Sequence, residues 1–96
     1  MTPIEEQTRG QAAQMLLDNE LLRQALDAIE SEVVDQWEKC PARDAEGKEA
    51  LWQLFKTSKK FRALLNGYVQ TGKLASENLK RFDEQESRLR RLFKAA

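Results

Sequence analysis

Six basic side chains gather near the end of the chain, and their types and spacing suit the binding of negative charge. They are Lys80, Arg81, Arg88, Arg90, Arg91 and Lys94, and the stretch 88–94 contains no acid. A few cations near a helix C-terminus are favourable to the helix dipole, but six exceed that need. Three partners fit such a surface, in order of preference: the acidic part of this same chain, an acidic protein, and nucleic-acid phosphates. We therefore assign partner binding to Arg88, Arg90, Arg91 and Lys94.

Catalytic and metal-binding chemistry has little support in the sequence. There is no histidine, which removes the commonest general base and the usual zinc ligand. Asp83, Glu84 and Glu86 could hold a cation, but they lack the loop spacing and the turn-forming glycine of a calcium site. The four glycines do not have the spacing of a phosphate-binding loop. We predict that the protein is not an enzyme and uses no metal or cofactor.

The stretch from Trp37 to Trp52 holds the only cysteine, and it could be an active-site loop, a metal site or a helical corner. A reactive thiol needs a histidine or a basic pocket to lower its pKa, and no neighbour of Cys40 obviously supplies one. Pro41 stops a helix, and Asp44 is a good N-cap for the next one. We interpret the segment as a hairpin corner in which both tryptophans are buried, so that replacing either by Ala costs about 3–5 kcal/mol.

Four helices are predicted, joined at Asp18-Asn19, at 40–43 and at Thr71-Gly72. Thr2-Pro3-Ile4-Glu5 is a good helix start, but Gly10 weakens the helix there, so residues 1–10 are expected to fray or form a loose arm. A short helix then covers 11–17, a second runs to about residue 39, a third spans about 44–70 and a fourth about 73–94. Gly72 is expected to cap the third helix at its C-terminus. The fold class is all-α: one domain, 1–96, with a short N-terminal helix and three longer helices packed as an antiparallel hairpin or bundle.

Two apolar stripes in the second half of the chain, of which the first is wide, present more apolar surface than so small a layer of helices can cover. The first has heptad-like spacing over Leu51, Leu54, Ser58, Phe61, Leu65 and Tyr68. The second runs through Ala75, Leu79, Phe82, Leu89 and Phe93, and Glu86 interrupts it. We assign Phe61, Leu65 and Tyr68 as further partner-binding residues, and we expect a homo-oligomer or a subunit of a larger assembly.

Opposite charges are separated along the chain although the net charge is zero. Residues 1–46 hold eleven acids and four bases, a net charge of −7, and residues 47–96 hold twelve bases and five acids, a net charge of +7. Such a separation orients encounters between molecules more than it stabilises a fold. No apolar run approaches the roughly 18 residues of a membrane span, and no signal peptide is evident, so we expect a cytoplasmic protein that does not contact a membrane.

Several short stretches together resemble small helical proteins of tailed bacteriophages that are often encoded near the portal and capsid genes. The stretches are Leu16-Leu17-Asp18-Asn19 before a leucine-rich helix, Trp37, Pro41, Arg43-Asp44-Ala45-Glu46-Gly47, Leu51-Trp52, Phe61-Arg62 and Gly72-Lys73-Leu74-Ala75. The pattern covers roughly residues 11–75, and the basic tail beyond Ser76 lies outside it. The resemblance implies a non-enzymatic role in virion assembly, with other phage structural proteins as partners, in the host cytoplasm during assembly or in the virion. The alternative is a small regulatory protein that binds a host protein or nucleic acid through its basic last helix.

Overall fold

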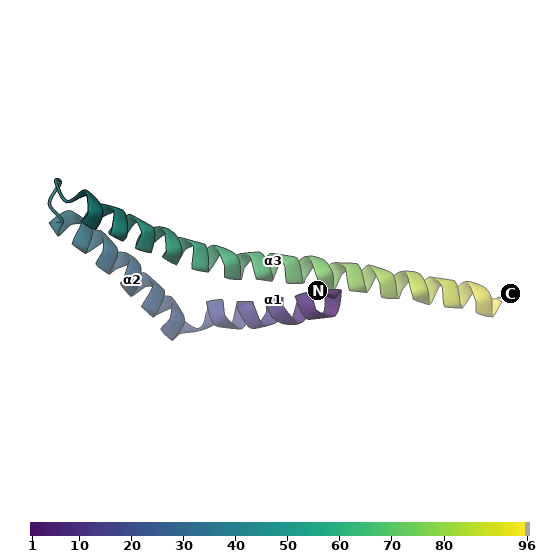
Figure 1. Cartoon of the computed structure of the whole chain (residues 1–96). Coiled ribbons are helices and arrows are strands. Elements are labelled where there is room, and N and C mark those ends of the chain that lie inside the picture. Colours follow the sequence, from purple (N-terminus) through teal and green to yellow (C-terminus); the bar gives the residue numbers. More distant parts are fainter. Residues whose placement is uncertain (96) are drawn as a thin grey trace.

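The structure, a computed structural model, describes residues 1–95 and contains three α-helices (Figure 1). They are α1 (Pro3–Asp18), α2 (Glu20–Lys39) and α3 (Ala45–Ala95). The predicted all-α class is confirmed, and no strand occurs in the described part of the chain. The predicted number of four helices is wrong. The molecule measures 80 × 25 × 16 Å with a radius of gyration of 22.1 Å, whereas a compact chain of this length has about 12–13 Å.

The start of α1 is the capped helix that the sequence indicated, and it includes the residues expected to form a loose arm. The side chain of Thr2 accepts a hydrogen bond from the Glu5 backbone N–H at 3.2 Å, and Pro3 occupies the first turn, where a missing N–H costs nothing. Gly10 lies in the middle of α1 and is buried. The expectation of a loose arm over residues 1–10 is therefore wrong, because the glycine that suggested it is a packing residue.

Two of the predicted connections are confirmed by their capping residues. Asn19 separates α1 from α2: its backbone is extended, and its Oδ1 accepts a hydrogen bond from the Leu22 backbone N–H at 2.9 Å. At the second corner Cys40 is also extended, and Asp44 Oδ1 accepts from the Gly47 backbone N–H at 2.9 Å. Asn and Asp are preferred at these positions because their short side chains reach the first unpaired backbone N–H groups of a helix.

The predicted stop at Thr71-Gly72 is absent, and α3 runs without interruption for 51 residues. Gly72 has no positive φ, which a C-terminal glycine cap requires, and it is buried. The predicted helices 44–70 and 73–94 are thus two parts of one helix. Gly72 faces Gly10 of α1, so it serves the close approach of two helices rather than the end of one.

The three helices form a hairpin with unequal sides (Figure 1). α1 and α2 follow one another along one side, bent at Asn19, and α3 returns along the other. α1 lies against the middle of α3, where Ala13, Leu65 and Val69 form a small buried cluster. α2 meets the first part of α3 and diverges from it toward Asn19. The end of α3 extends past the start of α1.

Polar contacts hold α2 against α3 where the apolar contact is thin. Glu30 of α2 accepts a hydrogen bond from Ser58 at 3.4 Å and pairs with Lys59 at 3.5 Å and with Arg62 at 3.0 Å. Arg62 also pairs with Asp27 at 2.6 Å. The hydrogen bond to Asp27 raises the pKa of Arg62 above its ordinary value, as expected for a guanidinium paired with carboxylates. Some of the acidic charge of the first half is therefore matched within the fold, but by the middle of α3 and not by its basic end.

Candidate protein-docking surfaces

The last part of α3 is a helix without a neighbour, and we call residues 80–94 the C-terminal arm. Every residue of the arm is exposed. Three of its apolar side chains lie on one face, since Phe82, Leu89 and Phe93 are separated by steps of seven and four, and Leu92 lies to the side of that face. These three side chains are 63%, 54% and 79% exposed. A helix with one apolar face in water is typical of a segment that packs against another helix.

The first residue of α1 determines where along α3 the cover by a second helix ends. Gln7 Nε2 donates a hydrogen bond to Ser76 Oγ at 3.1 Å, and Gly10 faces Gly72. Because α1 and α3 run in opposite directions, Pro3 falls opposite about residue 80 of α3. Leu79 is accordingly half-buried, whereas Phe82 is exposed. The apolar stripe thus continues beyond the helix that covers it.

The charges of the arm are divided between its two halves. Residues 80–87 carry two bases and three acids, and residues 88–94 carry four bases and no acid. Arg90 pairs with Glu86 of its own helix at 2.8 Å. Within residues 1–95 no ion pair joins the arm to α1 or α2. The four bases that we assigned to partner binding, Arg88, Arg90, Arg91 and Lys94, therefore lie exposed together at one end of the molecule.

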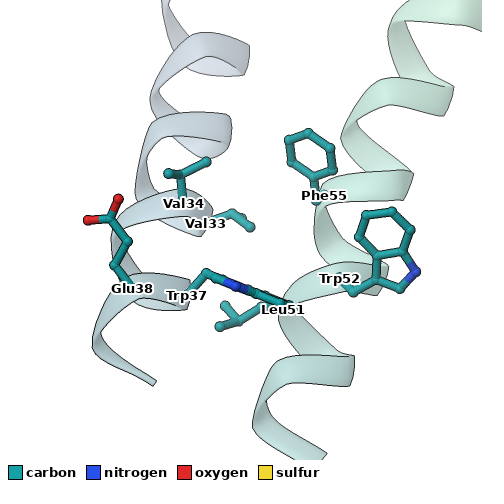
Figure 2. Close-up of a pocket in the computed structure, with 7 residues that line it drawn as sticks. All are labelled: Val33, Val34, Trp37, Glu38, Leu51, Trp52 and Phe55. Carbon is teal, nitrogen blue, oxygen red and sulfur yellow. The ribbon is translucent and has the colours of Figure 1, made fainter. Parts of the chain in front are cut away.

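A second apolar surface lies at the corner between α2 and α3. Val33, Val34 and Trp37 of α2 face Leu51, Trp52 and Phe55 of α3 across an open groove of about 290 Å³, with Glu38 at its rim (Figure 2). The two tryptophans are 40% and 46% exposed, so they line the groove and do not seal the corner as expected. The groove has apolar walls and one carboxylate, which suits an apolar side chain of a partner better than a reacting substrate.

Cys40 has a structural environment at this corner. Its thiol is half-buried and lies 3.8 Å from Asp44 Oδ2 and 3.8 Å from the Pro41 carbonyl oxygen. Both neighbours are hydrogen-bond acceptors, so the thiol is held as a weak donor. A nucleophilic cysteine needs a neighbouring histidine or cation that stabilises its thiolate, and neither of these two neighbours is one.

The three apolar residues that we assigned to partner binding are separated by the fold. Phe61 is exposed, in keeping with a docking role. Leu65 is only 8% exposed and belongs to the cluster under α1. Tyr68 is half-buried, with the Arg9 guanidinium 4.2 Å from its ring centroid. For Leu65 and Tyr68 the partner is α1 of the same chain. Neither the groove residues nor Phe82, Leu89 and Phe93 of the arm stripe are among the residues assigned to partner binding from the sequence, although the helical spacing of these three can be read there.

Comparison with protein-family models, with curated proteins and with solved structures gives no match for this chain. Among residues 1–95, no helix combines the length and the apolar character that crossing a membrane requires. Over the same residues, no three Cys, Asp or Glu side chains are arranged to hold a metal ion. The two exposed apolar surfaces described above, the C-terminal arm and the corner groove, are the candidate functional sites.

Proposed function

We propose that this chain is a non-enzymatic assembly protein that docks its helices onto copies of itself or onto other components of a particle. The observation that carries the proposal is the C-terminal arm. Its apolar stripe, and its four basic residues in a stretch without acids, are not covered by α1 or α2. Exposing large apolar side chains to water is unfavourable, at about 25 cal/mol per Å², and several of them on one face are typical of a protein interface.

The particle that we propose is that of a tailed bacteriophage, on the strength of the sequence resemblance over roughly residues 11–75. A rod-like helical protein with an apolar groove at one end and a basic arm at the other suits a role as a connector between larger components. On this proposal the protein acts in the host cytoplasm during assembly and then either leaves or remains in the virion.

The alternative function is regulatory binding to an acidic host protein or to nucleic acid. The specific observation in its favour is that Arg88, Arg90, Arg91 and Lys94 are all exposed on the arm. Binding to phosphates weakens steeply as salt rises, because counterions are released, whereas an apolar helical contact does not weaken in this way. Titration of a labelled DNA duplex at two salt concentrations tests the nucleic-acid form of this alternative: binding that weakens steeply with salt would support it, and no binding at the lower salt concentration would contradict it.

The proposal is tested in the genome that carries the gene. We expect genes for portal and capsid proteins on either side of it. Deletion of the gene should leave host lysis unchanged but yield incomplete particles under the electron microscope, and supply of the intact gene from a plasmid should restore them. Normal, infectious particles from the deletion strain would overturn an assembly role.

A further inference from the structure

We propose that two copies of this chain pair through their C-terminal arms in an antiparallel arrangement, each arm covering the stripe that α1 leaves bare on the other. The inference rests on the proposed function, since it names one partner for helix docking. It identifies that partner as a second copy and gives the alignment of the two helices.

The first support is the spacing of the residues on α3 that already have partners. Nine of the half-buried and buried positions form a row with steps of four and three: Leu51, Phe55, Ser58, Arg62, Leu65, Val69, Gly72, Ser76 and Leu79. Tyr68, Thr71 and Ala75, which are also buried or half-buried, lie beside this row. The row has a heptad spacing, which makes neighbouring helices wrap around α3 with a left-handed twist. Past Leu79, the same face continues at four successive turns of the helix. These turns carry the pair Phe82 and Asp83, then Glu86, then the pair Leu89 and Arg90, and then Phe93. The exposed face of the arm is therefore the continuation of the row of α3 residues that α1 and α2 cover earlier in the helix.

The length of the uncovered seam sets the alignment. A second helix that lies on α3 in line with α1 can extend only to about residue 80 of α3, because α1 begins there with Pro3. In an antiparallel pair, Phe93 of one copy can lie over Phe82 of the other, and Leu89 then lies over Glu86. In this alignment the two arms overlap over about 22 Å without either meeting α1. A deeper overlap would drive the tip of each arm into the first turn of α1.

Charge selects the antiparallel direction. Parallel arms would place four bases beside four bases in the outer halves and Glu86 beside Glu86. Antiparallel arms place the basic outer half of one copy beside the inner half of the other, which has a net charge of −1. The proposed alignment sets Asp83 near Arg90 of the second copy and brings the basic tip toward the acidic first turn of α1, Glu5 and Glu6. Opposite charges at such flanking positions determine which helices pair and in which direction.

The contact area determines how strong the pairing is. Two helices of this length bury on the order of 1,000 Å² in total, which is the lower limit for a specific interface. We therefore expect a reversible dimer with a dissociation constant in the micromolar range, not a permanent one.

The first experiment measures the dimer directly by sedimentation equilibrium of the full chain from about 5 to about 500 µM. The test variant is Leu89→Asp, and the matched control is Leu54→Asp, which changes a leucine of the same helix with a similar exposure (54% and 49%) away from the arm. We expect Leu89→Asp to weaken dimerisation by about tenfold or more and Leu54→Asp to leave it unchanged. A chain that stays monomeric throughout, or an equal effect of both variants, would overturn the proposal.

The second experiment tests direction. In a Cys40→Ser background, one chain carries Phe82→Cys and a second, mass-tagged chain carries Phe93→Cys, and the two are mixed in a glutathione redox buffer. The antiparallel alignment brings the two new thiols together and keeps the other Phe82–Phe93 contact of the dimer intact. We expect mainly the mixed disulfide by mass spectrometry. Predominant disulfides between identical chains would mean parallel pairing and would contradict the alignment.

These results separate the inference from the function on which it rests. If the purified chain remains monomeric while deletion of the gene still gives incomplete particles, the assembly role stands and the arm has another partner. If the dimer forms but particles are normal, pairing is real and the assembly role is wrong.

Discussion

Gly10 of α1 and Gly72 of α3 face each other so closely that a Cβ atom added to either would lie 2.8 Å from the Cα atom of the other. Real Cβ atoms essentially never approach so near. The added atom would meet backbone, including the Tyr68 carbonyl oxygen beside Gly10 and the Glu6 carbonyl oxygen beside Gly72, so no flexible side chain can move aside. Contact between the two backbones thus fixes the position of α1 along α3, and with it the start of the C-terminal arm.

Gly72→Ala should destabilise the protein, and Gly67→Ala should stabilise it. Both glycines lie inside α3, and alanine is the better helix former by about 0.5–1 kcal/mol. At position 67 an added Cβ meets nothing within 4 Å, so that gain is realised. At position 72 overpacking costs about 1–3 kcal/mol and outweighs it. Urea unfolding followed by circular dichroism measures both, and shifts of the same sign would contradict the close contact.

Glu30→Gln should lower the free energy of unfolding by about 1 kcal/mol, because Glu30 joins Lys59 and Arg62 across the α2–α3 contact. The amide keeps an acceptor for Ser58 but loses the charge. The control is Glu32→Gln, since Glu32 is exposed and bonds only to Gln36 of its own helix. Urea unfolding should show a change for the first variant and almost none for the second. Equal effects would mean that the ion pairs contribute nothing.

Trp37→Ala should cost about 1–2 kcal/mol, less than the 3–5 kcal/mol expected for a buried tryptophan. The side chain is still 40% exposed, and part of its contact is with Lys48, whose Nζ lies 4.4 Å from the ring centroid. Leu65→Ala, in the cluster under α1, should cost more, about 2–5 kcal/mol. Cys40→Ser should change stability by no more than about 0.5 kcal/mol. Thermal unfolding of the three variants gives the order, and a larger loss for Trp37→Ala than for Leu65→Ala would contradict it.

Reversal of the four outer bases should slow association without changing the helix content. The variant combines Arg88→Glu, Arg90→Glu, Arg91→Glu and Lys94→Glu, and the control replaces the three arginines by lysine, which keeps the charge. Raising salt from about 50 to about 500 mM should reproduce part of the loss in the parent protein, since exposed charges are screened. Association is followed by light scattering after stopped-flow mixing. Normal association of the four-Glu variant would mean that the basic end is only a solvated helix terminus.

Local chemistry made part of this fold predictable. Asn19 and Asp44 are side chains that satisfy the first N–H groups of a helix, and Pro41 prevents a helix from continuing, so the two real connections could be located from the sequence. These are properties of a residue and its near neighbours along the chain. They do not depend on which other helix lies alongside.

Both errors in the predicted helix pattern arise from one contact between distant residues. Glycine is common as a helix cap and also where two helices approach closely, and only the position of Gly10 opposite Gly72 distinguishes these uses. Predicting the candidate docking residues from the sequence meets the same difficulty. The stripe of Leu65 and Tyr68 indicated a partner but could not show that α1 covers these two residues. The basic cluster of the arm could be recognised because six bases exceed what the helix dipole explains, but the sequence could not show that they lie away from the acidic helices.

Because α3 is one unbroken helix, it also sets the distance between the two surfaces of the molecule. The corner groove begins at Leu51 and the arm ends near Phe93, and one continuous helix joins them without a joint at Gly72. Whatever binds in the groove is therefore held at a set distance and rotation from whatever binds on the arm, with about 1.5 Å and 100° for each residue between them. Seven residues inserted into α3 would separate the two attachments by about 10.5 Å while nearly preserving their orientation, and two residues would turn one away from the other by about 200°.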